Sequence, residues 1–298
     1  SNYFKFGGNS FGGIAVLGST NDVPVEIIAN GTRGFRIEPN ATSPNITLGH
    51  ALNDAGGVGV TGATVAGGGQ AGAINSATQS YATSSGGVGN HATGPAATIG
   101  GGNGNTASGS TATIGGGYFN NATATSSTVA GGIFNTAGGD NATVAGGMNN
   151  TALGFYSFAA GQQAKANSFG CFTWADNNAT DFACNTGNAF MARATGGVQF
   201  RTSLNLSTGC NIAAGGSGWT CTSSRETKKD FTAMDVVDVL KRVTEMPVTK
   251  WRYRTETSGA RHVGPMAEDF HAAFGLGEDN KAINSIDASG VALAAIQG

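Results

Sequence analysis

Hydrophobic and polar positions in the middle of the chain recur every fifteen residues. An asparagine marks one half of each unit, with an alanine two residues later; these asparagines are Asn75, Asn90, Asn105, Asn120, Asn135 and Asn150. A threonine marks the other half and is followed by Ile or Val, except before Ser84; these threonines are Thr83, Thr98, Thr113, Thr128 and Thr143. Two short β-prone stretches, each closed by Gly or Asn, predict one coil of a parallel β-solenoid, because helical repeats need longer units and far less glycine.

The irregular residues of the repeat lead to three further expectations. The early copy Ala63–Gly69 is four residues out of phase, so we expect an insertion in the first coil. Asparagine tolerates left-handed backbone and hydrogen-bonds its own neighbours, so we interpret the repeating asparagines as turn residues. Tyr118, Phe119 and Phe134 are expected to fill space between coils in preference to stacking on sugars.

A single coil of this composition buries little apolar surface. It offers its interior one β-branched residue, a few alanines and at most one aromatic residue, and apolar burial contributes only about 25 cal/mol per Å². Stacking coils about 4.8 Å apart pairs the backbone groups but leaves one apolar flank of a narrow solenoid uncovered. We therefore expect copies of the chain to associate along that flank. The repeat is similar to the head of trimeric autotransporter adhesins, and this resemblance implies three copies.

Residues 1–55 are expected to form a leader of short β-strands. Apolar residues there alternate or cluster between Asn, Gly and Pro, as they do in strands. The expected strands are 14–17, 25–28 and 34–37.

The repeat is assigned to residues 56–168, with Phe155–Gly161 as its last recognisable rung. Residues 169–222 contain more aromatic residues, as expected where a thin solenoid ends and needs a cap. We therefore expect a β-rich neck there, with strands at 172–174, 188–193 and 197–201.

Charge changes abruptly near Ser223. Residues 55–154 carry one charged residue, Asp140, whereas residues 223–298 carry ten Lys or Arg and eleven Asp or Glu. Such a shift marks a domain boundary, and it predicts a small α/β module over residues 223–298. Apolar spacing favours helices at 234–243, 267–274 and 290–297, the last capped by Asp287, and a strand at 249–253.

Ser223 and Lys228 form a candidate catalytic pair. A desolvated, neutral lysine can take the proton from a serine hydroxyl, and this chemistry needs no histidine. Burial must favour the neutral amine, because lysine titrates near about 10.4 in water. Positions five apart lie on opposite faces of a strand and well apart around a helix, so a turn or a neighbouring subunit must bring the two side chains together. The spacing alone favours an ordinary polar turn.

Three motifs in the module resemble a known family. The runs Ser223–Phe231, Pro247–Tyr253 and His262–Phe270 resemble the C-terminal intramolecular chaperone of endosialidases and phage tail spikes, which is a self-cleaving serine peptidase. The resemblance implies a trimerising module that assists assembly of the fibre before it and then severs itself. It also implies that the last helix continues beyond Gly298.

Carried over by position, the resemblance implies that Ser223 is the nucleophile, Lys228 the base and Thr222–Ser223 the bond that is cut. The commoner family pattern has Asp after the serine and Arg two residues before the lysine, where this chain has Ser224 and Glu226. This departure leaves both Ser223 and Ser224 as candidates for the attacking hydroxyl, and it leaves the efficiency of cleavage open.

The four cysteines fall into two close pairs, Cys171 with Cys184 and Cys210 with Cys221. An even count without Cys-x-x-Cys spacing or nearby histidines favours two local disulfides over a zinc site. Disulfides indicate an oxidising or extracellular setting. Four reduced, partly buried thiols are the alternative.

Composition also bears on ligands and partners. A net charge of −2 without a basic tract argues against nucleic acid, and no apolar run is long enough to span a bilayer. Asp176 and Asp181 lack the spacing of an EF-hand loop and are expected in a solvated turn, so we expect no metal and no cofactor. His262 and His271 lack a constellation of carboxylates or cysteines, and we expect a structural role for both.

Two classes of function fit these patterns. In the first, the chain is an extracellular homotrimeric fibre on a virion tail or bacterial cell surface, which binds a surface glycan or receptor, and whose last module chaperones assembly and cleaves itself once. In the second, a tail spike degrades glycans, which requires a cleft with two carboxylates. The first class is favoured, because residues 55–154 contain one Asp and no Glu. A surface adhesin with an inactive chaperone module is a third alternative.

Overall fold

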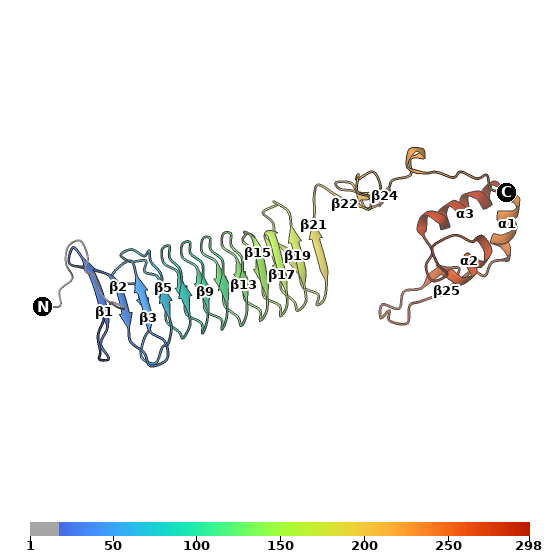
Figure 1. The fold of residues 1–298 in the computed structure, drawn as a ribbon. Coiled ribbons are helices and arrows are strands. Elements are labelled where there is room, and N and C mark those ends of the chain that lie inside the picture. Colours follow the sequence, from blue (N-terminus) through green and yellow to red (C-terminus); the bar gives the residue numbers. More distant parts are fainter. Residues whose placement is uncertain (1–17) are drawn as a thin grey trace, which may run out of the picture. The chain divides into compact units, whose positions relative to one another are not determined.

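The computed structural model describes residues 18–298, whose regular secondary structure is mostly short β-strands (Figure 1). The chain divides into two compact units: residues up to Phe200 together with Asn211–Thr220, and Arg201–Cys210 together with Cys221–Gly298. A β-solenoid of about ten turns is followed by a small region with a few helices and strands. The predicted solenoid fold is therefore confirmed.

The first strands form an antiparallel hairpin that leads into the solenoid. Strands β1 (Val25–Ala29) and β2 (Thr32–Glu38) are joined by Asn30 and Gly31, both with left-handed backbone, which suits a two-residue hairpin turn. Strand β3 (Asn45–Leu48) pairs antiparallel with β2 and parallel with β5, so the change to parallel pairing occurs at β3. Two of the three expected leader strands are confirmed, and the one at 14–17 lies outside the described residues.

Two parallel sheets run along the solenoid, and each coil adds one strand to each sheet. Figure 1 labels strands of the first sheet. After β3 the first sheet contains β5 (Thr64–Val65), β7 (Thr83–Ser84), β9 (Thr98–Ile99), β11 (Thr113–Ile114), β13 (Thr128–Val129), β15 (Thr143–Met148), β17 (Phe158–Gln162), β19 (Phe172–Ala175) and β21 (Phe190–Arg193). The second sheet contains β4 (Asp54–Ala55), β6 (Ser76–Ala77), β8 (His91–Ala92), β10 (Thr106–Ala107), β12 (Asn121–Ala122), β14 (Thr136–Ala137), β16 (Thr151–Ala152), β18 (Ala164–Ala166) and β20 (Phe182–Cys184). From β6 to β16 in the second sheet and from β7 to β15 in the first, paired residues are fifteen positions apart, as Thr113 and Thr128 are.

The expected insertion lies in the first coil of the repeat. Thr64 pairs with Thr83, nineteen positions later. The extra residues form a small turn in which Gln70 and Ala73 exchange two backbone hydrogen bonds. The regular interval has returned where Ser76 pairs with its partner in β8.

The interior of the solenoid is too narrow for aromatic side chains. Its largest apolar side chains, all fully buried, are Val65, Ile99, Ile114, Val129 and Val144, and alanines fill much of the remaining space. Tyr118, Phe119 and Phe134 are 43–50% exposed and pack on one another, with 5.9 Å between the ring centroids of the two phenylalanines. The expectation that these rings fill space between coils is therefore wrong, because only small or branched aliphatic residues fit there.

A column of asparagine side chains runs inside the solenoid. The six asparagines of the repeat are fully buried, and none has left-handed backbone. The backbone N–H of Asn120 donates to Oδ1 of Asn105 at 2.9 Å, and its own Oδ1 accepts from the N–H of Asn135 at 3.0 Å. Its Nδ2 donates to the carbonyl oxygens of Gly116 at 3.0 Å and Gly132 at 2.8 Å. The interpretation of these asparagines as turn residues is wrong, because their amides bridge consecutive coils and satisfy buried backbone groups.

Left-handed backbone occurs instead at the corners of the coils. One corner uses non-glycine residues fifteen apart, namely Tyr81, Ala96, Thr111, Ser126, Asn141 and Tyr156. The corner before each buried asparagine needs glycine for a different reason. Gly117 has a φ of +99°, and a Cβ at this position would lie 2.2 Å from the carbonyl oxygen of Gly132 in the next coil. Successive coils therefore approach too closely at this position for any side chain.

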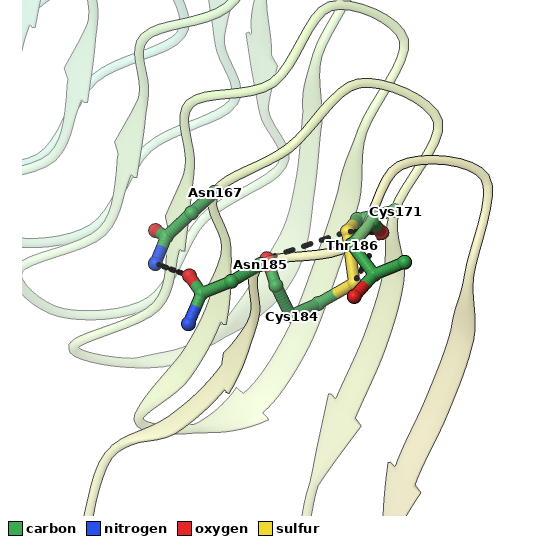
Figure 2. Close-up of a disulfide and its surroundings, with 5 residues drawn as sticks. All are labelled: Asn167, Cys171, Cys184, Asn185 and Thr186. Carbon is green, nitrogen blue, oxygen red and sulfur yellow. Dashed lines mark hydrogen bonds between the residues drawn. A yellow bond between two sulfur atoms is a disulfide. The ribbon is translucent and has the colours of Figure 1, made fainter.

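The solenoid continues beyond Phe155–Gly161, the last rung recognisable in the sequence, into the segment 169–222 expected to form a neck. Strands β19, β20 and β21 extend the same two sheets after the sequence repeat has ended. A disulfide joins Cys171 to Cys184 in these last coils, and Nδ2 of Asn167 donates to Oδ1 of Asn185 at 2.8 Å (Figure 2). A covalent link and a surface amide contact thus join coils in which the buried asparagine column no longer runs.

Asp176 is held by neighbouring donors at the end of the solenoid. Its carboxylate accepts from the hydroxyl of Thr195 at 2.6 Å, from the N–H of Thr195 at 2.8 Å and from Nε of Arg193 at 2.8 Å. These hydrogen bonds, those from Thr195 first, hold the pKa of the Asp176 carboxyl well below its usual range. Its side chain is only 13% exposed. The expected solvated turn is therefore wrong for Asp176, whereas Asp181, with a 65% exposed side chain, fits that description.

The C-terminal module contains three helices and a two-stranded antiparallel sheet. Its elements are α1 (Val236–Glu245), β25 (Thr249–Trp251), β26 (His262–Gly264), α2 (Ala267–Phe274) and α3 (Ser285–Gln297). One buried residue from each helix forms the core: Val239, Phe270 and Val291. The predicted helices are present, but Asn284 caps α3, and the predicted cap Asp287 lies in its first turn. Among residues 18–298, no helix combines the length and hydropathy needed to cross a bilayer.

Replacing Asn120 with Ala should destabilise the solenoid. The substitution removes the acceptor of the buried Asn135 N–H, and a buried group left without a partner costs about 1–3 kcal/mol. We expect the free energy of unfolding, measured by urea titration with circular dichroism, to fall by at least that amount. Asn121→Ala is the matched control, because the Asn121 side chain is exposed, and it should change stability by no more than about 0.5 kcal/mol. Equal losses in the two variants would contradict a structural role of the column.

Acidification should weaken the end of the solenoid through Asp176. Because the pKa of this carboxyl is depressed in the folded chain, its stabilising contribution is complete above the pKa of an unfolded Asp, about 3.9, and is lost as the pH falls toward the folded value. The thermal midpoint of the wild type should therefore fall more steeply below about pH 4 than that of Asp176→Asn. The control variant Asp181→Asn should follow the wild-type profile. Identical profiles for Asp176→Asn and the wild type would refute this role.

Candidate self-cleavage site

A short turn shapes the segment from Ser223 to Lys228. A 3₁₀ helix occupies Arg225–Thr227, and Oγ of Ser224 caps it by accepting the N–H of Glu226 at 3.2 Å. The hydroxyl of Thr227 donates to the carbonyl oxygen of Ser224 at 2.8 Å and closes the turn from the other side. Ser and Thr favour this local bonding over regular helix or strand, so the run of polar residues predisposes the segment to a turn.

The turn brings the two candidate catalytic residues together. Nζ of Lys228 donates to Oγ of Ser223 at 2.7 Å, although five positions separate them in the sequence. Backbone on both sides of the 3₁₀ helix is extended, so the chain reverses around it and the side chains meet. The turn that the sequence spacing required is therefore present within one chain.

The two neighbouring serines have different partners. Ser224 uses its hydroxyl as the cap of the 3₁₀ helix, whereas the hydroxyl of Ser223 meets the lysine. Glu226 takes part in the cap through its backbone N–H, and its side chain is exposed. Of the two serines left open by the sequence, this arrangement favours Ser223 as the attacking hydroxyl.

The residue before Ser223 is fixed by a separate set of contacts. Strand β22 spans Val198–Arg201, β23 spans Gly209–Ile212 and β24 spans Thr220–Cys221. A disulfide joins Cys210 to Cys221, with 4.0 Å between their Cα atoms. Thr222 donates both its N–H, at 2.9 Å, and its hydroxyl, at 3.2 Å, to the carbonyl oxygen of Gly209. Both cysteine pairs anticipated from the sequence are thus joined, one in the last coils of the solenoid and one beside the candidate site.

The candidate pair lies on the surface of the single chain. Thr222, Ser223 and Lys228 are all exposed. The guanidinium of Arg225 lies 5.1 Å from the ring centre of Phe231, so a cation–π contact spans the turn. Across residues 18–298, no group of three or more His, Cys, Asp or Glu side chains is placed to hold a metal ion. The chemistry that these residues can perform is proton transfer between a lysine and a serine hydroxyl next to a peptide bond.

Sequence reasoning missed a polar cluster around His262. Nε2 of His262 lies 3.1 Å from a carboxylate oxygen of Glu256, and Ser258 donates its hydroxyl to the same carboxylate at 2.9 Å. The hydrogen bond from Ser258, and then the one from His262, lowers the pKa of Glu256. The expectation that His262 has no carboxylate partner is wrong. Glu256 lies in a polar loop without a periodic pattern. Its two-residue spacing from Ser258 could have indicated the Ser258–Glu256 hydrogen bond, but no sequence signal indicated the contact with His262.

His271 fits a structural role, since its Nδ1 lies 2.9 Å from the carbonyl oxygen of Leu276 just after α2.

His262 also belongs to an aromatic group, and its ring centre lies 4.8 Å from that of Trp251 and 5.7 Å from that of Tyr253. The motifs Pro247–Tyr253 and His262–Phe270 thus meet at the β25–β26 pair. Their contact is consistent with structural roles for the histidines.

Comparison with known proteins concerns the C-terminal module alone. No curated protein matches the chain. A peptidase family described as chaperone of endosialidase matches residues 223–275, a region that begins at Ser223 and includes both the Ser223–Lys228 turn and the Trp251–His262 contact. The resemblance predicted from the sequence is confirmed: the C-terminal part of this chain, preceded by a β-solenoid, is similar to the chaperone of endosialidase.

Proposed function

We propose that the chain is an extracellular fibre whose C-terminal module assists homotrimer assembly and then cleaves the bond between Thr222 and Ser223. A β-solenoid followed by a chaperone-of-endosialidase region fits a tail fibre or tail spike. The observation that carries the cleavage proposal is the hydrogen bond of 2.7 Å between Lys228 and Ser223 at the first residue of the matched region. The two disulfides support an oxidising location outside the cell.

The proposed reaction has two steps. The neutral amine of Lys228 takes the proton from the hydroxyl of Ser223, whose Oγ attacks the carbonyl carbon of Thr222. The carbon–nitrogen bond breaks, and the departing nitrogen takes the proton back from the lysine, which leaves an ester on Ser223 with a free α-amino group. Water then hydrolyses the ester, so Thr222 ends as a carboxylate and Ser223 regains its hydroxyl.

Association of the chains would also favour this reaction. Burial favours the neutral amine of a lysine over its ammonium. Ser223 and Lys228 are exposed in the single chain, so a second copy that covers them would supply the missing burial. Cleavage would then follow assembly. This order is required of a chaperone that is released once assembly is complete.

One side of the solenoid supports association of the copies. We call this side the outer flank. It is defined by six large apolar side chains that are each 37–50% exposed, namely Tyr118, Phe119, Ile133, Phe134, Met148 and Trp174. Tyr118, Ile133 and Met148 stack in parallel register, and Ile133, Met148 and Trp174 line a shallow groove. Residues 55–154 carry a single charge, so two copies that meet along this flank desolvate few ions. An apolar strip that repeats at the spacing of the coils suits a second copy with the same spacing.

Substitution of Ser223 should abolish cleavage. Wild-type protein should separate in a denaturing gel into fragments 1–222 and 223–298, and the smaller fragment should begin with Ser223 in N-terminal sequencing. Ser223→Ala and Lys228→Ala should each run as one intact chain, because the nucleophile or the base is missing. Mass spectrometry of the denatured chains provides the measurement.

Ser224→Ala is the matched control, because Ser224 caps the turn without contacting Lys228. It should still yield both fragments, although loss of a cap costs about 0.5–2 kcal/mol of local stability. Cleavage in Ser223→Ala, or its loss in Ser224→Ala alone, would assign the reaction to the other serine. An intact wild-type chain would refute the cleavage proposal.

Placing a charge on the outer flank should disrupt the trimer. Ile133→Lys forces an ammonium into the proposed interface, and burying such an ion costs on the order of several kcal/mol. Sedimentation velocity should show a trimer for the wild type and a smaller species for the variant. Ser110→Lys is the control, because Ser110 is exposed at the corner between the second sheet and the first, at the other end of the coil. A trimeric Ile133→Lys protein would exclude this flank as the interface.

A further inference from the structure

Separate contacts hold the two sides of the proposed scissile bond. On the amine side, the 3₁₀ turn holds Ser223 through the cap at Ser224 and the contact with Lys228. On the carbonyl side, Thr222 is held by its two hydrogen bonds to Gly209 and by its neighbour Cys221. The attacking oxygen and the attacked carbon thus belong to two local frames that meet at one peptide bond.

The frame on the carbonyl side depends on its disulfide. Strand β24 contains only Thr220 and Cys221, and so short a strand is marginal by itself. The disulfide ties Cys221 to Cys210, the residue after the hydrogen-bond acceptor Gly209. Opening it would leave Thr222 tethered to this part of the chain by the two-residue strand β24 and by the hydrogen bonds of Thr222 itself, which is exposed, so that water competes with them.

We propose that the Cys210–Cys221 disulfide positions the Thr222 carbonyl for attack by Ser223, so that self-cleavage depends on the redox state of this pair. The inference rests on the proposed cleavage. Thr222 alone separates Cys221 from Ser223, so few backbone dihedrals lie between the disulfide and the reacting carbon. An attacking atom must lie about 3–3.5 Å from its target, and a displacement of about 1 Å can cost about 100-fold in rate. Cys210 and Cys221 are positioning residues, since the chemistry remains that of Ser223 and Lys228.

The chain offers an internal control in its second disulfide. Cys171 and Cys184 are also joined, but they are fully buried in the last coils of the solenoid, in the other compact unit. If a reductant slowed cleavage only by weakening the fold in general, then removal of the Cys171–Cys184 disulfide should slow cleavage as well. If the reductant acts through the Cys210–Cys221 disulfide, removal of the Cys171–Cys184 disulfide should leave the cleavage rate unchanged.

The test follows the cleavage rate of the full chain during cell-free synthesis. With dithiothreitol, which supplies the two electrons that convert the disulfide into two thiols, wild-type precursor should cleave about 10- to 100-fold more slowly than under oxidising conditions. Cys210→Ala/Cys221→Ala should be slow in both conditions. Cys171→Ala/Cys184→Ala should be fast when oxidised and slow when reduced, like the wild type.

Reoxidation separates the positioning role of the Cys210–Cys221 disulfide from a purely structural role, because a structural role predicts no change in cleavage rate when the disulfide re-forms in an assembled trimer. Reduced precursor from the Cys171→Ala/Cys184→Ala background is isolated, and oxidised glutathione is added to take the two electrons back. Cleavage should accelerate about 10- to 100-fold as the Cys210–Cys221 bond forms, while the proportion of trimer, measured by native mass spectrometry, stays constant. The same addition should leave Cys210→Ala/Cys221→Ala slow.

The possible failures are distinct. Equal cleavage rates for reduced and oxidised wild type, or no acceleration on reoxidation, would overturn the positioning role and leave the Ser223 chemistry intact. A wild-type chain that is cleaved under neither condition would overturn the proposed cleavage and this inference with it.

Discussion

The buried asparagine column is the interaction on which the solenoid depends. A coil of fifteen residues encloses a very small interior, and the backbone N–H of each asparagine in the column is buried there. Each amide supplies the missing donors and acceptors and also contacts the coil before and the coil after it. A column of hydrogen-bonded amides fixes how the coils stack, because a buried polar group that loses its partner costs more free energy than one hydrogen bond contributes. The fixed interval of the sequence follows from this contact.

The same constraint decides what lies outside. With amides, alanines and one branched residue per coil inside, aromatic rings have no place in the interior and gather on the outer surface. The apolar surface left by folding is therefore on a flank of the solenoid, where a second chain can bury it. A narrow interior and an apolar outer flank are two results of one geometry.

Periodicity made part of this structure predictable. The coil length, the threonine register and the insertion follow from repetition, because a repeated residue must occupy a repeated position. The burial of the asparagines did not follow, since asparagine has equally good local reasons to occupy a turn. The final strands β19–β21 keep the fold without the repeat, and the Ser223–Lys228 contact arises in a polar turn with no period. Such contacts depend on where the chain reverses, and spacing alone does not reveal that.

Because the junctions along the asparagine column, from Asn75 to Asn150, use the same amide contact, the coils of this stretch are interchangeable. Recombination between the closely similar repeats of the gene can add or delete whole coils in frame without changing either end of the solenoid. Each such event alters the length by about 4.8 Å. The length of the solenoid can therefore evolve in small, equal increments, while the sequence of the C-terminal module is inherited unchanged.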